Sequence, residues 1–286
     1  MLGRLFDVSN KLVMLLLLAI VLYPLYYMAI VSISAGDAVS RGDVYFIARG
    51  INFHAYHLIL KDPAIVRSYL NTILYTSAGV TLNLIMTTLC AYPLSRREFY
   101  GRSFFSFFVV FTMFFDGGLI PKYIVVHSLG MVNTIWALIV PVAINVFYLI
   151  LMRTFFQNVP EEIHEAATMD GVGELRKIIQ IVLPLSLPVM ATMFLFYSVS
   201  HWNSFFSALI YLNDNKLYPI QILLRNIVIQ GEMAAQMTDA ADRDFQLLSL
   251  NIKYAVVYVA ILPILFVYPF VQKYFVQGSM LGSVKG

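Results

Sequence analysis

The side chains that could carry chemistry are concentrated in one polar stretch of this sequence. It reads EAATMDGVGELRKIIQIVLP and contains Glu165, Asp170, Glu174, Arg176 and Lys177. Hydrolytic chemistry would need a further motif, and the chain has no HExxH, no G-x-S-x-G and no acids clustered in its apolar segments. It also lacks the G-x-x-x-x-G-K-[ST] loop that holds nucleotide phosphates. We therefore expect a contact surface here rather than an active site, and we expect this chain to bind no ATP and no other cofactor.

Metal binding and disulfide chemistry are also disfavoured. His54 and His57 have a spacing that metal sites use, but no further ligand lies near them in the sequence, so we expect an ordinary loop and no metal. Cys90 is the only cysteine and lies in an apolar run, so it cannot form an intrachain disulfide. It is expected to be a small core residue.

The composition is that of a membrane protein. Hydrophobic residues make up 60% of the chain and charged residues 12%, and the mean hydropathy is +0.77. Soluble domains average about 45–50% apolar and about 25% charged residues. The net charge is only +3 and the basic residues are spread along the chain, so nothing indicates a nucleic-acid partner.

Six segments are apolar enough to cross a bilayer, whose core needs about 20 apolar residues per helix. Five are nearly free of charge, and the third carries one acid, Asp116, near its end. The first is too long for the apolar core of a signal peptide, which has about 7–15 residues. We predict an all-α integral membrane protein with one domain over residues 1–286 and spans at about 12–33, 68–95, 103–121, 130–152, 184–210 and 254–272.

Positive charge in short loops predicts the orientation. The loop SRREFYGR between the second and third spans contains Arg96, Arg97 and Arg102 against one acid. This loop and both termini are therefore expected in the cytoplasm, together with residues 153–183 and a tail at 273–286. The long loop 211–253 is expected outside.

The polar stretch is expected to form a helix, a tight turn and a second helix. Ile163, Ala166 and Ala167 recur at helical spacing and give the first helix a small apolar face. Gly171 can adopt the left-handed conformation that ends a helix, and a second amphipathic run ends at Pro184. An acidic helix with an alanine face suits docking against another protein. The alternative, a helix resting on lipid, favours Lys, Arg and bulky apolar residues.

These residues resemble a known motif. Glu165-Ala166-Ala167, three residues, Gly171, nine residues and then Ile181-Val-Leu183-Pro184 resembles the EAA loop of ABC importer permeases. The six spans and the later sequence HWNSFF extend the resemblance over nearly the whole chain. Within this family the sequence is most similar to the carbohydrate-uptake permeases, the group of the maltose importer's second permease. DGGLIPKYIVVHSLGMVNTIWALIVP and FVQGSMLGSVKG resemble the subgroup for complex oligosaccharides, which includes the alginate-oligosaccharide importer.

The resemblance implies the type I ABC importer permease fold in a bacterial inner membrane, and it implies several partners. These are a homologous permease in a heterodimer, two cytoplasmic ATPases that bind ATP and Mg²⁺, and an extracytoplasmic solute-binding protein. The EAA helix would dock on an ATPase, with the loop 211–253 reaching the binding protein and the tail threading between the ATPases. The residues implied are Glu165, Ala166, Ala167, Asp170 and Gly171 for coupling, and Gly278, Gly282 and Lys285 in the tail.

An oligosaccharide substrate, acidic in the implied subgroup, needs aromatic faces and polar groups along its path. Candidate path residues near the outer end of the fifth span are Tyr197, Trp202 and Asn203. The others are Asn145 and Tyr148, expected on one helix face, and Asn83. Each has another interpretation, because Trp and Tyr form interfacial belts and a buried Asn can tie helices together.

Other functions remain open at this point. A non-sugar solute would keep the same architecture. A proton- or sodium-driven transporter would need ionisable groups within the spans, where the chain offers only Asp116 and His201 near outer ends. A noncatalytic assembly subunit would need no polar path.

Overall fold

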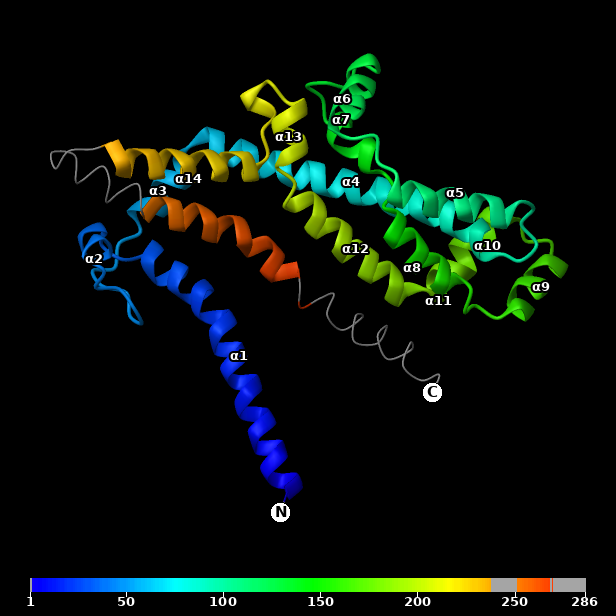
Figure 1. Ribbon diagram of the computed structural model, residues 1–286, viewed down its shortest axis with the longest axis horizontal. Helices are drawn as coiled ribbons and strands as arrows, with labels where there is room; N and C mark the ends of the chain where they lie inside the picture. Colours follow the sequence, from blue (N-terminus) through cyan, green and yellow to red (C-terminus); the bar gives the residue numbers. More distant parts are fainter. Residues whose placement is uncertain (1, 238–250, 268, 270–286) are drawn as a thin grey trace. The chain divides into compact units, whose positions relative to one another are not determined.

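The computed structural model describes residues 2–237, 251–267 and 269, and every regular element among them is a helix (Figure 1). The predicted all-α class is therefore confirmed for this part of the chain. The chain divides into two compact units, one formed by Met1–Tyr69 and Ile220–Pro263 and the other by Leu70–Pro219 and Ile264–Gly286.

Among the described residues, the core of the first unit is formed by side chains from four helices. This core includes Ala55, Ile59, Ile220 and Val256, which are nearly completely buried. The side chain of Asn251 donates a hydrogen bond to the Ser34 carbonyl at 2.8 Å. The helices that contribute to the unit as a whole are α1 (Leu2–Ser32), α2 (Gly36–Ser40), α3 (His54–Lys61), the start of α4 (Pro63–Ser95), α14 (Ile220–Met237) and the helix Asn251–Val267 as far as Pro263.

The second unit contains the rest of α4 and the helices that follow it in the chain. Its core joins α4 to α8 and α12 through buried side chains such as Ala91, Leu149, Met152 and Met193. The following helices are α5 (Arg102–Phe114), α6 (Leu119–Ser128), α7 (Trp136–Ile139), η1 (Val140–Val142), α8 (Val146–Phe156), α9 (Glu161–Met169), α10 (Glu174–Lys177), η2 (Ile178–Val182), α11 (Leu183–Leu185), α12 (Leu187–Trp202), α13 (Phe206–Tyr211) and η3 (Asn215–Leu217). Figure 1 shows α9 and α10 at one end of this unit, well separated from α6, α7 and α13.

Among the residues that the structure describes, two helices, Phe6–Ser32 within α1 and Pro63–Ser95, are long and apolar enough to cross a membrane unbroken. Three more spans are possible if each bent helix pair counts as one: α5 with α6 at 114°, Trp136–Val142 with α8 at 52°, and Glu174–Leu185 with α12 at 88°. The shorter apolar helix Asn251–Val267 lies where the sixth span is predicted. Six spans with the stated bounds therefore stay a prediction.

The structure differs from four predicted segments, and the one over 130–152 is broken between Val142 and Val146. The helix expected over 103–121 stops at Phe114, because the chain turns at Gly118 (φ +80°), whose amide donates to Asp116 at 2.7 Å. The helix expected over 184–210 stops at Trp202, and a separate α13 follows. The expected outer loop 211–253 is helical at its centre, since α14 begins at the buried Ile220. Residues 238–250 of that loop and the tail residues Gly278, Gly282 and Lys285 lie outside the described residues.

Candidate functional site: a coupling surface and a polar cleft

The helix–turn–helix of the polar stretch is present, and Gly171 ends its first helix. Glu161 and Glu162 occupy the first turn of α9, where the helix dipole favours acids. Gly171 has φ +73°, its amide donates to Thr168 O at 3.0 Å, and the amide of Val172 donates to Ala167 O at 2.9 Å. This pair of bonds is the Schellman arrangement, which favours glycine at the left-handed position. The predicted role of Gly171 as the turn is confirmed.

One face of α9 packs inward and the other is free in this chain. His164 and Ala167 are 2% and 5% exposed, whereas Glu165, Ala166 and Asp170 are exposed. The expectation that Ala167 faces a partner is wrong, because its methyl group is already buried against this chain. Ala166 keeps the expected exposure.

Met169, 88% exposed, belongs to the free face and was missed from the sequence. It lies one turn after Glu165, and the spacing i, i+4 on a helix could have found it. We call Glu165, Ala166, Met169 and Asp170 the coupling face.

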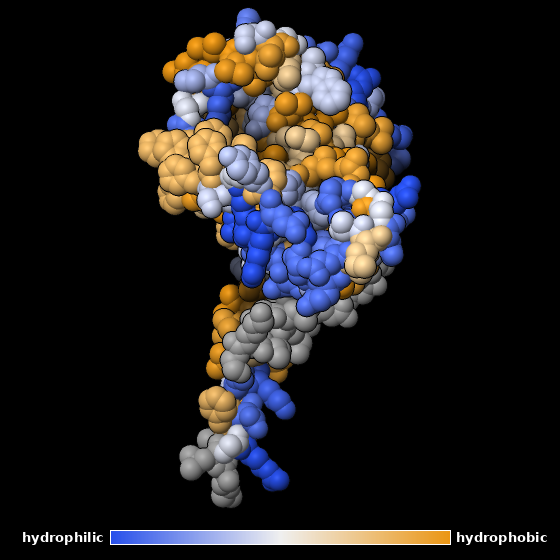
Figure 2. Space-filling view, turned by 90° about the vertical axis from the view of Figure 1, so that its right-hand side faces the viewer, coloured by the Kyte–Doolittle hydropathy of each residue, from blue (hydrophilic) through white to orange (hydrophobic). Residues whose placement is uncertain are grey.

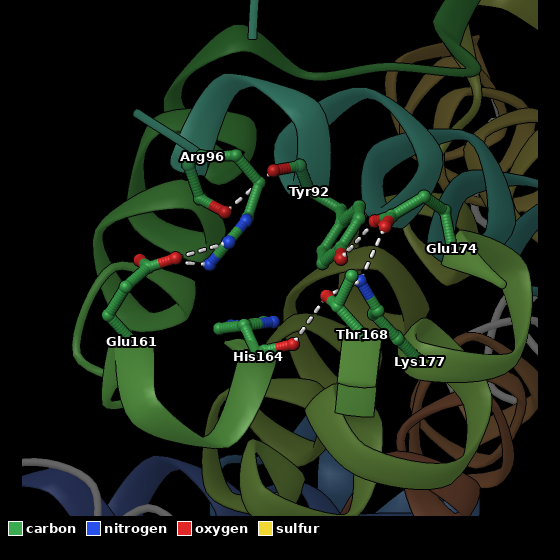
Figure 3. Close-up of polar contacts among 8 residues, drawn as sticks. Tyr92, Arg96, Glu161, His164, Thr168, Glu174 and Lys177 are labelled. Carbon is green, nitrogen blue, oxygen red and sulfur yellow. Dashed lines mark hydrogen bonds and ion pairs between the residues drawn. The ribbon is translucent and has the colours of Figure 1, made fainter. Parts of the chain in front are cut away.

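Behind the coupling face, a polar cluster fastens α9 and α10 to the end of α4 (Figure 3). The Tyr92 hydroxyl donates to Glu174 Oε2 at 2.6 Å, and Lys177 Nζ contacts Glu174 Oε1 at 2.6 Å. Lys177 Nζ also donates to Thr168 Oγ1 at 2.8 Å. We call Tyr92, Thr168, Glu174 and Lys177 the Tyr92 cluster. Lys177 is buried, and these two oxygens accept from two of the three N–H groups of its ammonium.

A second tie joins the same elements. The Arg96 guanidinium binds both carboxylate oxygens of Glu161 at the start of α9. His164 lies between the two ties, with its ring centre 6.2 Å from that of Tyr92 (Figure 3). Burial lowers the pKa of His164, and the positive charge of Arg96 lowers it further. Its Nδ1 has no hydrogen-bond partner within the described chain, which a neutral imidazole tolerates better than a charged one.

Figure 2 looks at this end of the unit and shows hydrophilic side chains gathered there, with hydrophobic ones above them. A small pocket of about 190 Å³ lies at the same end, lined by Ser95, Arg96, Arg97, Arg102, Phe156, Gln157, Val159 and Glu161. The arginines that predict the cytoplasmic side therefore adjoin α9.

A polar cleft of about 430 Å³ lies elsewhere in the same unit and brings three predicted path residues together. Asn145, Tyr148 and Tyr197 line it, along with Met113, Asp116, Lys122, Pro141, Val142, Ile144, Val146, Phe147, Ser200 and His201. The Tyr148 and Tyr197 rings meet edge to face at 4.9 Å. Asn145 precedes α8 instead of sharing a helix face with Tyr148. Its Oδ1 accepts from the Tyr148 amide at 3.2 Å and so caps the helix.

The other path candidates lie around this cleft. Asn83 is completely buried behind it, donating to Val142 O at 2.5 Å and pairing with His201 Nε2 at 2.6 Å. It therefore joins helices, as the alternative interpretation expected. Trp202 is also buried. Asn203 is exposed and lines a neighbouring cleft of about 270 Å³ that shares Val142, Ser200 and His201 with the first.

The charge of the cleft comes from one ion pair. Lys122 Nζ lies 2.5 Å from Asp116 Oδ2, and both side chains are more than half exposed. Among the described residues no group of three His, Cys, Asp or Glu side chains could hold a metal ion. The arrangement can bind a polar solute and fasten a partner, and both are tasks of a membrane transport component.

Comparisons with known proteins also indicate a membrane transport component, and they assign the chain to a family. Residues 99–279 match the family of binding-protein-dependent transport system inner membrane components. The polygalacturonan/rhamnogalacturonan transport system permease protein YtcP of Bacillus subtilis is 42% identical over 289 residues, covering 99% of each chain. Protein LplC of the same organism is 41% identical over 284 residues, covering 99% of this chain and 96% of the relative.

A solved structure is also similar over almost the whole chain. It is a crystal structure of a bacterial ABC transporter involved in the import of the acidic polysaccharide alginate. One of its chains superposes with a TM-score of 0.86 at 33% identity, covering 95% of this chain and 97% of that one. The chain therefore belongs to the binding-protein-dependent transport system inner membrane components, and it is a multi-pass permease. The resemblance to ABC importer permeases is confirmed.

Proposed function

We propose that this chain is the permease subunit of an ATP-driven oligosaccharide importer, and that the coupling face of α9 is its contact with the ATPase. The observation that carries this is the division of α9 into two faces. Its inner face is buried and fastened to α4, while Glu165, Ala166, Met169 and Asp170 stay free. A small residue between acids, with a flexible apolar Met beside them, suits a groove in another protein.

The remaining partners and the orientation follow from the same arrangement. ATP and Mg²⁺ are bound by two cytoplasmic ATPases, because this sequence has no phosphate-binding loop. One chain supplies half of the path and pairs with a homologous permease, and an extracytoplasmic binding protein delivers the solute. The loop with Arg96, Arg97 and Arg102 adjoins α9 and lies in the cytoplasm in this proposal. An even number of spans puts both termini on that side.

The substrate is an acidic oligosaccharide in this proposal. The support comes from the relatives, whose names give polygalacturonan, rhamnogalacturonan and alginate, and from the cleft. Tyr148, which is half-buried, offers an aromatic face to sugar C–H surfaces, and Asn145 and Ser200 add polar groups. Tyr197 is only 3% exposed and packs against Tyr148. Lys122 is the cation available to a carboxylate, although Asp116 neutralises it in this structure.

Charge reversal on the coupling face tests the ATPase contact. In a complex reconstituted with its partner permease, ATPases and binding protein, Glu165→Arg should lower transport and ATPase copurification while the chain stays inserted. Glu98→Arg is the matched control, because Glu98 is also exposed in an arginine-rich cytoplasmic loop but lies off α9. Equal losses in both variants would remove the assignment of the coupling face.

A panel of loaded binding proteins tests the substrate. Oligogalacturonides or alginate oligosaccharides should stimulate ATP hydrolysis more than neutral oligosaccharides of the same length. Stimulation by amino acids or peptides and by no sugar would defeat the oligosaccharide proposal while leaving the ATPase contact intact.

A further inference from the structure

The coupling face and the polar cleft are joined by one stretch of α4. Tyr92 and Arg96 near the end of this helix hold α9 and α10, whereas Asn83 and Thr87 hold residues of the cleft. Asn83, Thr87 and Tyr92 lie on this helix, which contains Pro93 and continues to Ser95, and Arg96 follows directly after it. At 1.5 Å per residue, Asn83 and Arg96 are about 20 Å apart along the axis. The helix therefore reaches from one site to the other.

The hydrogen bonds and ion pairs at the cytoplasmic end of α4 are short and involve charged groups. Three links of 2.6–2.8 Å run from Tyr92 through Glu174 and Lys177 to Thr168. The donors Tyr92 and Lys177 are 5% and 4% exposed, whereas the Glu174 side chain is 64% exposed, so water reaches the carboxylate but not the two donors of these charge-assisted bonds. The pairing of Arg96 with both oxygens of Glu161 adds a contact whose direction is fixed.

The ties at the cleft end hold residues that line it. Thr87 Oγ1 lies 2.7 Å from the Tyr197 hydroxyl, and Asn83 Oδ1 lies 2.6 Å from His201 Nε2. The Tyr197 hydroxyl also accepts from the Asn145 amide at 3.2 Å. A shift of α4 would therefore move two cleft side chains directly and disturb the cap of α8.

We propose that Tyr92 and Arg96 are positioning residues that make this part of α4 move with α9 and α10. A displacement of the coupling face by the ATPase then reaches Tyr197 and His201 through this helix, which is held on both sides and carries Pro93 near its cytoplasmic end. This rests on the proposed function, because it takes the coupling face to be the ATPase contact. The simpler view is that the ties only hold the loop in place, so the test separates coupling from stability.

The first experiment removes a single hydroxyl group. In the full reconstituted complex, Tyr92→Phe deletes the bond to Glu174 and keeps the buried ring. Tyr100→Phe is the matched control, because Tyr100 is 95% exposed on the neighbouring loop. Tyr92→Phe should leave assembly and basal ATP hydrolysis unchanged and lower the stimulation by sugar-loaded binding protein about threefold to tenfold, a usual range for a coupling residue. Unchanged stimulation would overturn the role of Tyr92.

A charge exchange tests Arg96 by rescue. Arg96→Glu and Glu161→Arg should each lower the stimulation ratio, and the double variant should restore part of it, because the pair is re-formed in reverse. Restored complex yield without any restored stimulation would assign the pair a structural role only and overturn the role of Arg96.

A measurement made without sugar tests the role of Tyr92 independently of the proposed substrate. With Cys90 replaced by Ser, a cysteine introduced by Ser200→Cys lies at the cleft, and its labelling by a thiol reagent is compared with and without nucleotide. Nucleotide should change the labelling rate, and Tyr92→Phe should reduce that change. If no sugar stimulates the complex but this difference persists, the substrate is wrong and the α4 link stands. If Tyr92→Phe leaves the nucleotide effect intact, the link is refuted even where the sugar assignment holds.

Discussion

The contact between Gly79 on α4 and the ring of His201 gives a quantitative test of how the cleft is built. A Cβ added at Gly79 would lie 2.5 Å from His201 Cε1 and 2.6 Å from Nε2. Observed Cβ contacts are not this short, so the ring must move and its 2.6 Å bond to Asn83 must break. We expect Gly79→Ala to destabilise the chain and to displace a residue that lines the cleft.

Three contributions determine how much Gly79→Ala changes the free energy of unfolding. Overpacking costs about 1–3 kcal/mol, and loss of the hydrogen bond between Asn83 and His201 costs about 0.5–1.5 kcal/mol. Replacing glycine by alanine inside a helix stabilises the folded state by about 0.5–1 kcal/mol. The net effect is a loss of about 0.5–4 kcal/mol, and the apparent melting temperature should fall by about 2–4 °C per kcal/mol. Gly3→Ala is the control, because nothing lies within 4 Å of a Cβ there and only the helix gain remains.

Thermal unfolding of the purified complex in detergent measures this effect, and stimulated ATP hydrolysis reports on the cleft. Repeating the Gly79→Ala substitution in a His201→Ala variant identifies the cause of the destabilisation. In His201→Ala the ring is gone, so Gly79→Ala should lose most of its penalty, as expected for two residues in contact. A penalty of the same size in both backgrounds would refute the clash with His201 as its source.

Three further predictions concern the coupling stretch and the ion pair. Gly171→Val should uncouple ATP hydrolysis from transport in a normally abundant complex, because a β-branched residue at φ +73° is strained although the space is open; full transport would contradict it. Burial holds the pKa of His164 below that of the unfolded chain, so the unfolded state binds the extra proton and stability should fall as pH falls through about 6.5. His164→Gln should flatten the melting temperature between pH 7.5 and 5.5, and an unchanged slope would exclude this histidine as the cause. Asp116→Asn frees the charge of Lys122 and should raise the ratio of stimulation by acidic to neutral oligosaccharides, whereas Lys122→Met should not.

The coupling stretch was largely predictable because its signals are local. Acids at a helix start, small residues at helical spacing and a glycine at the end each act within a few residues. They predicted the helix, its turn and the exposure of Glu165. They could not tell which alanine faces inward, since that depends on what packs against the helix. Ala167 is buried on the same face of α9 as His164, whose ring lies against that of Tyr92 on α4, and the sequence does not show such a neighbour.

The Tyr92 cluster could not be predicted for the same reason. Tyr92 and Glu174 are 82 positions apart, and nothing near Tyr92 marks it as different from the other tyrosines of an apolar helix. The helix breaks were missed for another reason. Hydropathy counts apolar residues along the chain and carries no information on direction, so the 114° bend after Phe114 leaves the apolar run intact. The FFDGG sequence was the available signal, because paired glycines after an acid favour a turn.

The α9 end and the polar cleft of the second unit differ in how far their charged side chains are neutralised. At the α9 end the arginines are only partly neutralised, because Glu161 pairs with Arg96 while Arg97 and Arg102 line the same pocket. In the cleft the one ion pair is balanced. A cleft without net charge does not retain an acidic sugar by long-range attraction, and conduction requires that a solute can leave again. Selection for a carboxylate is then best placed on the binding protein, which must hold the sugar tightly. The cleft can bind the C–H surfaces and hydroxyl groups that many sugars share, through its aromatic and polar side chains. The Asp116→Asn variant addresses this division directly, because a freed Lys122 should let the cleft itself favour acidic sugars and so raise the ratio of stimulation by acidic to neutral oligosaccharides.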